Sequence, residues 1–313
     1  MRVPFPAAIT TTSTAAIVFP YSFNHACARL GRIIGVITLC VGLSACSAIK
    51  LGYANLPELS YWWLDSYIDF NDEQAPRARE DLTRLHQWHR GAELPRYVAL
   101  LRRAELMAGA DVSAAQACEL ADEGRLRLAA VAAQAEAPLT ATALTLTPEQ
   151  LRHLARRSER KNREFRKEWI DVSVEQRKEK RFKQIAERFE MFYGDLEEPQ
   201  RKLLRQQVDA SSFDPARALA ERQRRQAELM TLLRQLQAPS LPLQQARMLV
   251  RAHLHAITTP PEGPPRQMME ALLQEGCANV AAIHNIATPA QRQRVAQRLR
   301  GWQRDFTELS FPL

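Results

Sequence analysis

The segment LTPEQLRHLARRSERKNREFRKEW, residues 146–169, contains the signals for the start and body of a helix. Thr147 is a favourable N-cap residue, Pro148 suits the first helical position, and the side chain of Gln150 can reach back to the cap amide, as in a capping box. Apolar residues such as Leu151 then recur at helical spacing among charged ones. The segment predicts an amphipathic α-helix.

The rest of the chain has the same character. Glycine is scarce, at 11 of 313 residues, while the strong helix formers Ala, Leu, Arg, Gln and Glu are abundant. No segment alternates apolar and polar residues over the length of a strand, so we expect essentially no sheet. We predict an all-α, elongated bundle of about ten helices, at residues 56–70, 72–90, 94–107, 113–136, 148–172, 174–194, 197–209, 215–237, 243–257, 265–286 and 289–308.

Two interruptions suggest how these helices are grouped. One is the Thr-, Ala- and Leu-rich segment APLTATALTLT, and the other is ITTPPEGPP, whose four prolines and glycine cannot continue a helix. Beyond a tether at residues 46–55, we expect an N-terminal helical region at 56–137, a linker at 138–147, central basic helices at 148–256, a Pro-rich linker at 257–265 and a C-terminal helical hairpin at 266–313.

The segment RLGRIIGVITLCVGLSACSAIK, residues 29–50, has the order of a secretory signal. Basic residues precede a mostly apolar run that is too short to span a bilayer, and small residues follow it. Residues 1–45 are therefore excluded from the fold prediction as leader and signal peptide. Residues 1–28 fit the signal poorly, and they are either a misassigned start or an unusually long basic region.

Residues 43–46, Leu-Ser-Ala-Cys, resemble the lipobox of bacterial lipoproteins. The resemblance implies cleavage before Cys46, diacylglycerol on its thiol and a further acyl chain on its amine. A plain signal peptide, or a buried helix with an incidental cysteine, is the alternative. Ser47 follows the cysteine, and the absence of aspartate there favours the outer membrane, on its periplasmic side.

Cysteine usage leaves one further question. Of the five cysteines, Cys27 and Cys40 lie in the leader and Cys46 is the lipidation candidate, so Cys118 and Cys277 remain. An even pair in an oxidising compartment is a candidate disulfide, and such a bond would contribute about 4–5 kcal/mol in the chain-entropy model. Two separate buried thiols are the alternative.

Aromatic rings are concentrated in NLPELSYWWLDSYIDF, residues 55–70, close behind the candidate lipid. We favour a packed N-terminal helix for this segment. A membrane-interface anchor and a partner-binding patch are the alternatives, because Trp and Tyr favour interfaces. Nearby acids would be repelled by anionic headgroups. The candidate patch consists of Tyr61, Trp62, Trp63, Tyr67 and Phe70, and the acids are Asp65, Asp69, Asp72 and Glu73.

The sequence LTPEQL at residues 146–151 is echoed by ATPAQR at 287–292 and loosely by LEEPQR at 196–201. The pattern resembles the LTxxQ family of periplasmic chaperones, which are small helical cradles that hold unfolding clients. Helix capping alone also explains it: Thr147 with Gln150, and Thr288 with Gln291, are placed as capping boxes.

Residues 151–190 contain 14 Lys or Arg against eight acids. Their apolar residues form one stripe per helix, which indicates either a solvated charged face over a packed stripe or a basic and apolar groove for anionic clients or lipid. From residue 46 on, the chain has 40 Lys or Arg against 35 acids, a net charge of +5. It is only mildly basic, and we expect no nucleic-acid partner.

Motifs for catalysis or metal binding are not found. His86 and His89 with Glu93 share a helix face, but Gly91 interrupts before Glu93 and no second motif completes four ligands. His253 and His255 point to different faces. No nucleophile elbow, phosphate-binding glycine loop or paired cysteine motif is present. We expect no enzyme activity, no metal and no cofactor.

Several segments together resemble an uncharacterised family of predicted helical lipoproteins from Gram-negative bacteria. They are YWWLDSYIDFNDEQ, LHQWHRGAELPRYVALL, LTPEQLRHLARRSERKNREFRKEW, ERFEMFYGDLEEPQRKLL and FDPARALAERQRRQ. The resemblance implies an all-α lipoprotein and transfers no site.

We expect a non-enzymatic binding or envelope-maintenance role on the membrane, chaperone-like in one form, for a protein client that binds the groove of the central helices. The alternative is an interaction subunit of an envelope complex that uses the aromatic segment 61–70.

Overall fold

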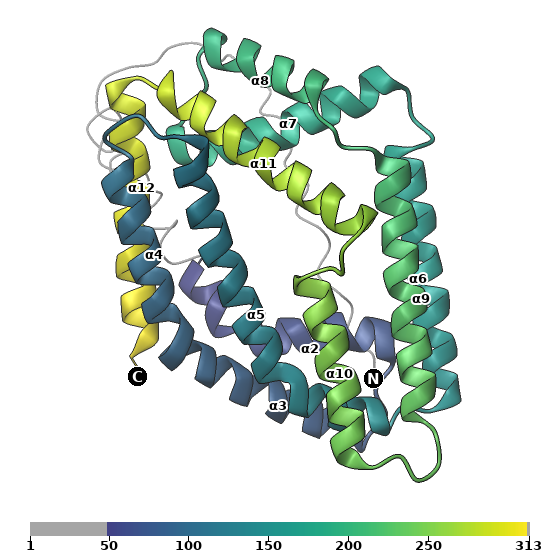
Figure 1. The fold of residues 1–313 in the computed structure, drawn as a ribbon. Helices are drawn as coiled ribbons and strands as arrows, with labels where there is room; N and C mark the ends of the chain where they lie inside the picture. The colour runs from purple at the N-terminus through teal and green to yellow at the C-terminus, as the bar shows by residue number, and fades with distance from the viewer. Residues whose placement is uncertain (1–48, 312–313) are drawn as a thin grey trace, which may run out of the picture. The chain divides into compact units, whose positions relative to one another are not determined.

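The computed structural model describes residues 49–311, and within that range the prediction of an all-α fold without strands is confirmed (Figure 1). Residues 49–54 are helical, and a π turn, η1 (His89–Glu93), follows the second of the longer helices. The helices are α2 (Leu56–Ile68), α3 (Gln74–Trp88), α4 (Leu94–Met107), α5 (Ala114–Leu144), α6 (Pro148–Trp169), α7 (Val174–Tyr193), α8 (Glu198–Ala210), α9 (Pro215–Leu236), α10 (Leu243–Thr258), α11 (Pro264–Asn285) and α12 (Pro289–Ser310).

Helix starts follow the capping signals in the sequence. In α6 the hydroxyl of Thr147 accepts a hydrogen bond from the backbone N–H of Gln150, and the Gln150 side chain accepts one from the N–H of Thr147. The same reciprocal bonds open α12 at Thr288 and Gln291. Each box satisfies backbone donors that a helix start leaves without partners.

Two hydrophobic cores hold the helices together. The first lies among α4, α7, α8, α11 and α12, and the second lies among α5, α6, α9 and α10. Helix α5 packs on both α10 and α11 and so borders both cores. Figure 1 shows α4 beside α12 at one edge and α6 beside α9 at the other. The buried members include Phe182, Leu204 and Ile283 in the first core and Leu232, Leu236 and Ala246 in the second.

The expected linker at residues 138–147 is largely absent, because α5 continues through Pro138 to Leu144. A proline inside a helix loses one backbone hydrogen bond and costs about 3 kcal/mol. Packing beyond it offsets that cost: Thr140 is 1% exposed, and Ala143 belongs to the second core. Burial of the residues after Pro138 therefore prevails over the local signal to end the helix.

The expected C-terminal hairpin at 266–313 is also wrong in its pairing. Helix α12 packs mainly on α4 and also on α7, while α11 packs on α5 and α8. The Pro-rich linker reduces to a turn at residues 259–263, where Gly263 has a φ of 127°, which favours glycine. The separately predicted regions pack together in one compact unit, Ala48–Leu313. Helix α12 joins the ends of this unit, because its Val295 and Leu299 are buried in the first core, to which α4 also contributes.

Cys118 of α5 and Cys277 of α11 form a disulfide, with Cα atoms 5.3 Å apart and 159 residues between them in sequence. Of the two interpretations that the sequence left open, the structure contains the bonded pair. The bond fixes α11 onto the start of α5.

Gly91 does not end a helix as expected, since η1 leads directly from α3 into α4.

Within residues 49–311 no helix has the length and apolarity to cross a bilayer.

Candidate functional site

Helix α2 presents one face to the body of the protein. Tyr61 is 6% exposed and stacks on Phe70 with ring centroids 5.8 Å apart, while the guanidinium of Arg79 lies 3.5 Å from the centre of its ring. Burial raises the pKa of Tyr61. Ile68 packs against the second core. On this side α2 is a packed helix.

The opposite side of α2 is apolar and exposed. Leu56, Leu59, Trp62 and Trp63 are 42%, 46%, 54% and 62% exposed. Positions 56, 59 and 63 lie three and four residues apart and so share one helix face. We call these four residues the outer α2 face. A helix that is apolar on both sides is normally buried on both, so this face is a candidate contact surface.

The acids of this segment fall into two groups, those that have a partner within the protein and those that are exposed beyond the end of α2. Asp65 accepts a hydrogen bond from the backbone N–H of Phe70 at 2.9 Å, and Glu58 forms an ion pair with Arg79 at 3.2 Å. Asp69 is exposed at the end of α2, as are Asp72 and Glu73 in the following turn. The two acids within α2 are therefore engaged, and the others lie beyond its last turn.

The helical segment 49–54, directly after the lipidation candidate, is fastened to the body. Lys50 forms ion pairs with Asp305, at 3.4 Å, and with Glu308 of α12. The hydroxyl of Tyr53 lies 2.8 Å from Nδ1 of His89. Burial raises the pKa of Tyr53 to about 12, so its phenol is neutral. Cys46 itself lies outside the described residues.

The histidines considered as metal ligands are used in packing. The rings of His86 and Tyr53 lie 4.6 Å apart, and burial lowers the pKa of both His86 and His89. Glu93 is completely buried and accepts a hydrogen bond from Arg96 at 2.6 Å. Residues 49–311 contain no group of three or more His, Cys, Asp or Glu placed to hold a metal ion.

The glutamines of the Thr-Pro-x-Gln echo point inward and meet other helix starts. Gln150 donates from Nε2 to the carbonyl of Asp69 at 2.9 Å and to the side-chain oxygen of Gln74 at 2.6 Å. Two pairs of glutamines are hydrogen-bonded side chain to side chain, and all four residues are buried. The pairs are Gln74 with Gln150 and Gln200 with Gln291.

The second pair repeats this geometry elsewhere in the molecule. Gln291 donates to the carbonyl of Asp195 at 3.0 Å and to the side-chain oxygen of Gln200 at 2.8 Å. The loose echo at residues 196–201 thus supplies the partner of Gln291. The sequence analysis did not identify Gln74 as the partner of Gln150. The pattern that could have indicated it is Asn-x-x-Gln at residues 71–74, where Asn71 and Gln74 form the two reciprocal bonds of a capping box. The motif works as a cap that also joins two helix starts.

The apolar stripes of the central helices face the cores. Leu151 and Leu154 of α6 belong to the second core or pack on it, and Phe182 of α7 belongs to the first. Trp169 packs edge-on against Phe213 with centroids 5.9 Å apart. The surface of α7 instead has an open groove of about 620 Å³, whose lining is Glu175, Gln176, Glu179, Lys180, Lys183 and Gln184. These helices therefore present mainly charged groups to solvent.

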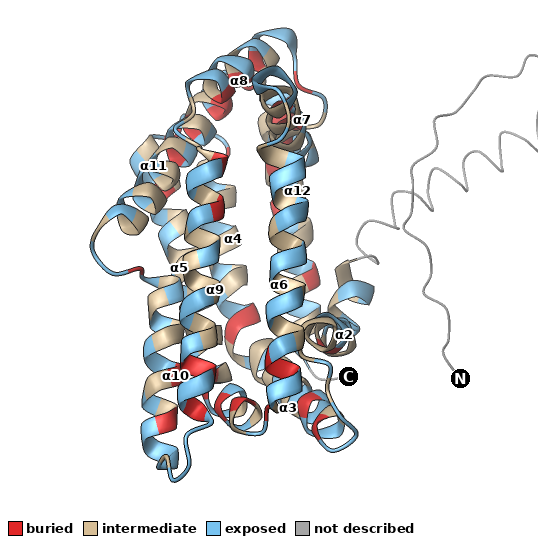
Figure 2. Ribbon diagram, turned by 90° about the vertical axis from the view of Figure 1, so that its right-hand side faces the viewer, coloured by how far each residue is buried: buried red, intermediate tan, exposed pale blue. Residues whose placement is uncertain are grey.

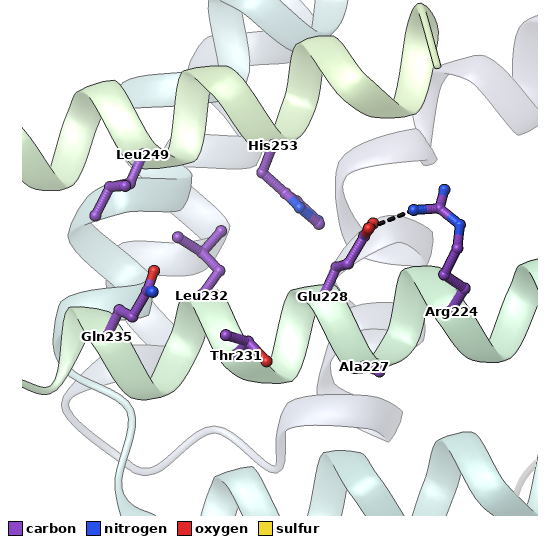
Figure 3. A pocket seen from close by; sticks show the side chains of 8 residues that line it. All are labelled: Arg224, Ala227, Glu228, Thr231, Leu232, Gln235, Leu249 and His253. Atoms are coloured by element: carbon purple, nitrogen blue, oxygen red, sulfur yellow. Dashed lines mark hydrogen bonds and ion pairs between the residues drawn. The ribbon is translucent and has the colours of Figure 1, made fainter. Parts of the chain in front are cut away.

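An open cavity of about 410 Å³ lies between α9 and α10. Figure 3 shows His253 of α10 pointing toward Glu228 of α9, which is paired with Arg224. Leu232 and Leu249 form the apolar part of its lining. Burial lowers the pKa of His253, so its ring is neutral near pH 7. The cavity has room for a small polar molecule, but its charged groups already satisfy each other.

One protein family matches the chain. It is described as a family of unknown function (DUF6279), and the match covers residues 66–249, from the last turn of α2 into α10. No curated protein and no solved structure matches.

Proposed function

Because the chain belongs to DUF6279, a family of unknown function, we propose a role from its own residues. The protein is a lipoprotein, anchored through Cys46 to the periplasmic side of the outer membrane. There it binds other envelope proteins and catalyses no reaction. The membrane and a protein client are its partners.

The observation that carries this proposal is the position of the lipobox-like segment Leu-Ser-Ala-Cys. It follows an apolar run of signal-peptide length and ends three residues before the helical segment 49–54. Several acyl chains hold a protein stably on a bilayer, whereas one chain binds it only reversibly. The disulfide between Cys118 and Cys277 suits an oxidising compartment such as the periplasm.

A binding role agrees with the use of the buried ionisable groups. Glu136 is bound by Arg247 at 2.8 Å and by Arg251 at 2.7 Å, and these contacts lower its pKa to about 2. His284 lies between the hydroxyl of Tyr193 and the carbonyl of Ala110. Such groups hold helices together, and their partners leave them little capacity to act on a substrate.

A chaperone-like form of this role is supported by the resemblance to the LTxxQ family and by apolar side chains on the outside of several helices. They include Leu106 of α4, Leu126 and Leu128 of α5, and Leu243 and Met248 of α10, at 60–76% exposed. Side chains of this kind can contact the apolar segments of an unfolding client.

The test begins with the protein purified from membranes. Its mass should correspond to a chain starting at Cys46 with acyl chains attached. Residues 47–313, without lipid, should then suppress the aggregation of a chemically unfolded client at stoichiometric amounts. Leu126→Ser/Leu128→Ser should weaken the suppression, because it removes two apolar contacts that are each 60% exposed.

Gln134→Ser, an exposed polar substitution on the same helix, is the matched control and should leave suppression unchanged. An unmodified Cys46 would contradict the anchor. A client that aggregates equally with and without excess protein would contradict the chaperone-like form.

A further inference from the structure

We propose that the outer α2 face, Leu56, Leu59, Trp62 and Trp63, lies on the surface of the bilayer that holds the lipid anchor, beside anionic headgroups bound by α6. The inference rests on the proposed anchor at Cys46. It adds a second, non-covalent contact that sets how the helical body is oriented on the membrane.

The short connection to the anchor brings this face to the bilayer. The three residue steps from Cys46 to Ile49 span at most about 11 Å when fully extended. Two residues, Ser47 and Ala48, separate Cys46 from Ile49, where the described helix begins. That segment cannot swing freely, because Lys50 and Tyr53 fasten it to α12 and η1. Helix α2 begins only two residues after this segment ends, at Leu56.

The chemistry of the face suits a membrane interface. Indole rings prefer the headgroup level, where one part of the ring is apolar and the N–H is hydrated. Two adjacent tryptophans more than half exposed, with two leucines on the same side, supply the apolar contact. A helix lying in the interface plane buries such a face while its opposite side stays in contact with protein or water.

Positive charge lies on the same side of the molecule. Arg156, Arg160, Arg163 and Lys167 are exposed and lie four, three and four residues apart, which puts them on one face of α6. This face is opposite the Leu151 and Leu154 side that packs toward α9. Figure 2 shows α2 on the side of α6 that is away from α9. We infer that the basic face of α6 and the outer α2 face point toward the same bilayer surface.

The two helices are also in direct contact. The ring nitrogen of His153 lies 3.3 Å from the carbonyl oxygen of Ser66, and the Arg157 guanidinium lies 5.4 Å from the ring centre of Tyr67. Glu58 and Asp65, the acids on α2, are engaged by Arg79 and by a backbone N–H. On α6, Arg163 is paired with Glu159 at 2.7 Å, which leaves Arg156, Arg160 and Lys167 to attract an anionic surface.

Tryptophan fluorescence provides the test. The full lipoprotein is inserted into vesicles of phosphatidylethanolamine and phosphatidylglycerol whose acyl chains carry bromine, which quenches nearby indoles. We expect quenching, and we expect Trp62→Phe/Trp63→Phe to abolish it. Trp88→Phe is the matched control and should leave it in place, since Trp88 is half-buried at the end of α3 and is not part of the outer α2 face.

The charge arm uses the same vesicles. Arg156→Gln/Arg160→Gln/Lys167→Gln should reduce quenching in anionic vesicles and leave it unchanged in vesicles of phosphatidylcholine alone. Arg217→Gln, an exposed basic residue at the start of α9, is the control for a change of net charge elsewhere. Circular dichroism of every variant shows that the fold is retained.

The mass of the same sample separates this inference from the proposed function. A lipidated protein whose tryptophans are not quenched overturns the inference alone. An unmodified Cys46 overturns the anchor. If that unmodified protein is still quenched in the presence of vesicles, the α2 contact is supported. If it is not quenched, the α2 contact is overturned as well. Crosslinking from position 63 that captures another protein or a second copy in place of lipid also overturns it.

Discussion

Glutamine at the third position of a helix has two different roles in this protein, and burial decides which. Gln176 of α7 is exposed and only closes its own capping box. Gln150 closes the box of α6 and also binds the start of α3 through Gln74 and the Asp69 carbonyl. A capping pattern in the sequence predicts the first role. It says nothing about the second, because the partner lies 76 residues away.

We expect Gln150→Ala to destabilise the fold by about 2–3 kcal/mol, because it removes the buried hydrogen bonds with Gln74 and leaves the carbonyl of Asp69 without a partner. Gln291→Ala should behave alike through Gln200 and Asp195. Gln176→Ala, the control, should cost much less, since water replaces its bond. Denaturant unfolding measures the three values, and equal losses for Gln150 and Gln176 would contradict a paired role.

The sequence predicted helices better than it predicted their partners. Caps, prolines and periodic apolar residues are local, and they predicted α4 with the bounds that the structure has. The pairing of α12 with α4 depends on which apolar faces fit, and no local pattern encodes that. Helix α2 posed the same difficulty: its sequence favoured a packed helix without saying which rings face the core, and only the fold assigns Tyr61 inward and Trp63 outward.

Proline 138 marks a place where an element tolerates an unfavourable residue. It lies inside α5, where it removes a backbone donor, while Pro148 lies in the first turn of α6, where that donor has no helical partner anyway. We expect Pro138→Ala to stabilise the fold by about 1–3 kcal/mol. Pro148→Ala should change it little, and thermal unfolding followed by circular dichroism compares the two.

A stabilisation of equal size in both variants would show that the unfolded chain, and not the helix interior, is responsible. A loss of stability in Pro138→Ala alone would mean that its half-buried ring contributes more to packing than its missing N–H costs.

For the molecule as a whole, one covalent bond joins two helices that are far apart in sequence. The disulfide links the start of α5 to α11, with 159 residues between the two cysteines. We expect Cys118→Ser/Cys277→Ser to lose about 4–5 kcal/mol in the chain-entropy model, because the closed loop is long. Reductant should lower the melting temperature of the natural chain toward that of the variant and leave the variant unchanged. Melting curves that coincide with and without reductant would exclude a stabilising bond.

The packing of α12 against α4 and α7 has a consequence for biogenesis. A polypeptide synthesised from its N-terminus delivers α4 long before α12 leaves the ribosome. Until then Leu101 and Ala104, which pack on the first core, lack the surface that covers them. A product cut short ahead of Pro289 would keep them uncovered, so premature termination near the end of the gene should yield a substrate for proteases in place of a slightly shorter functional protein.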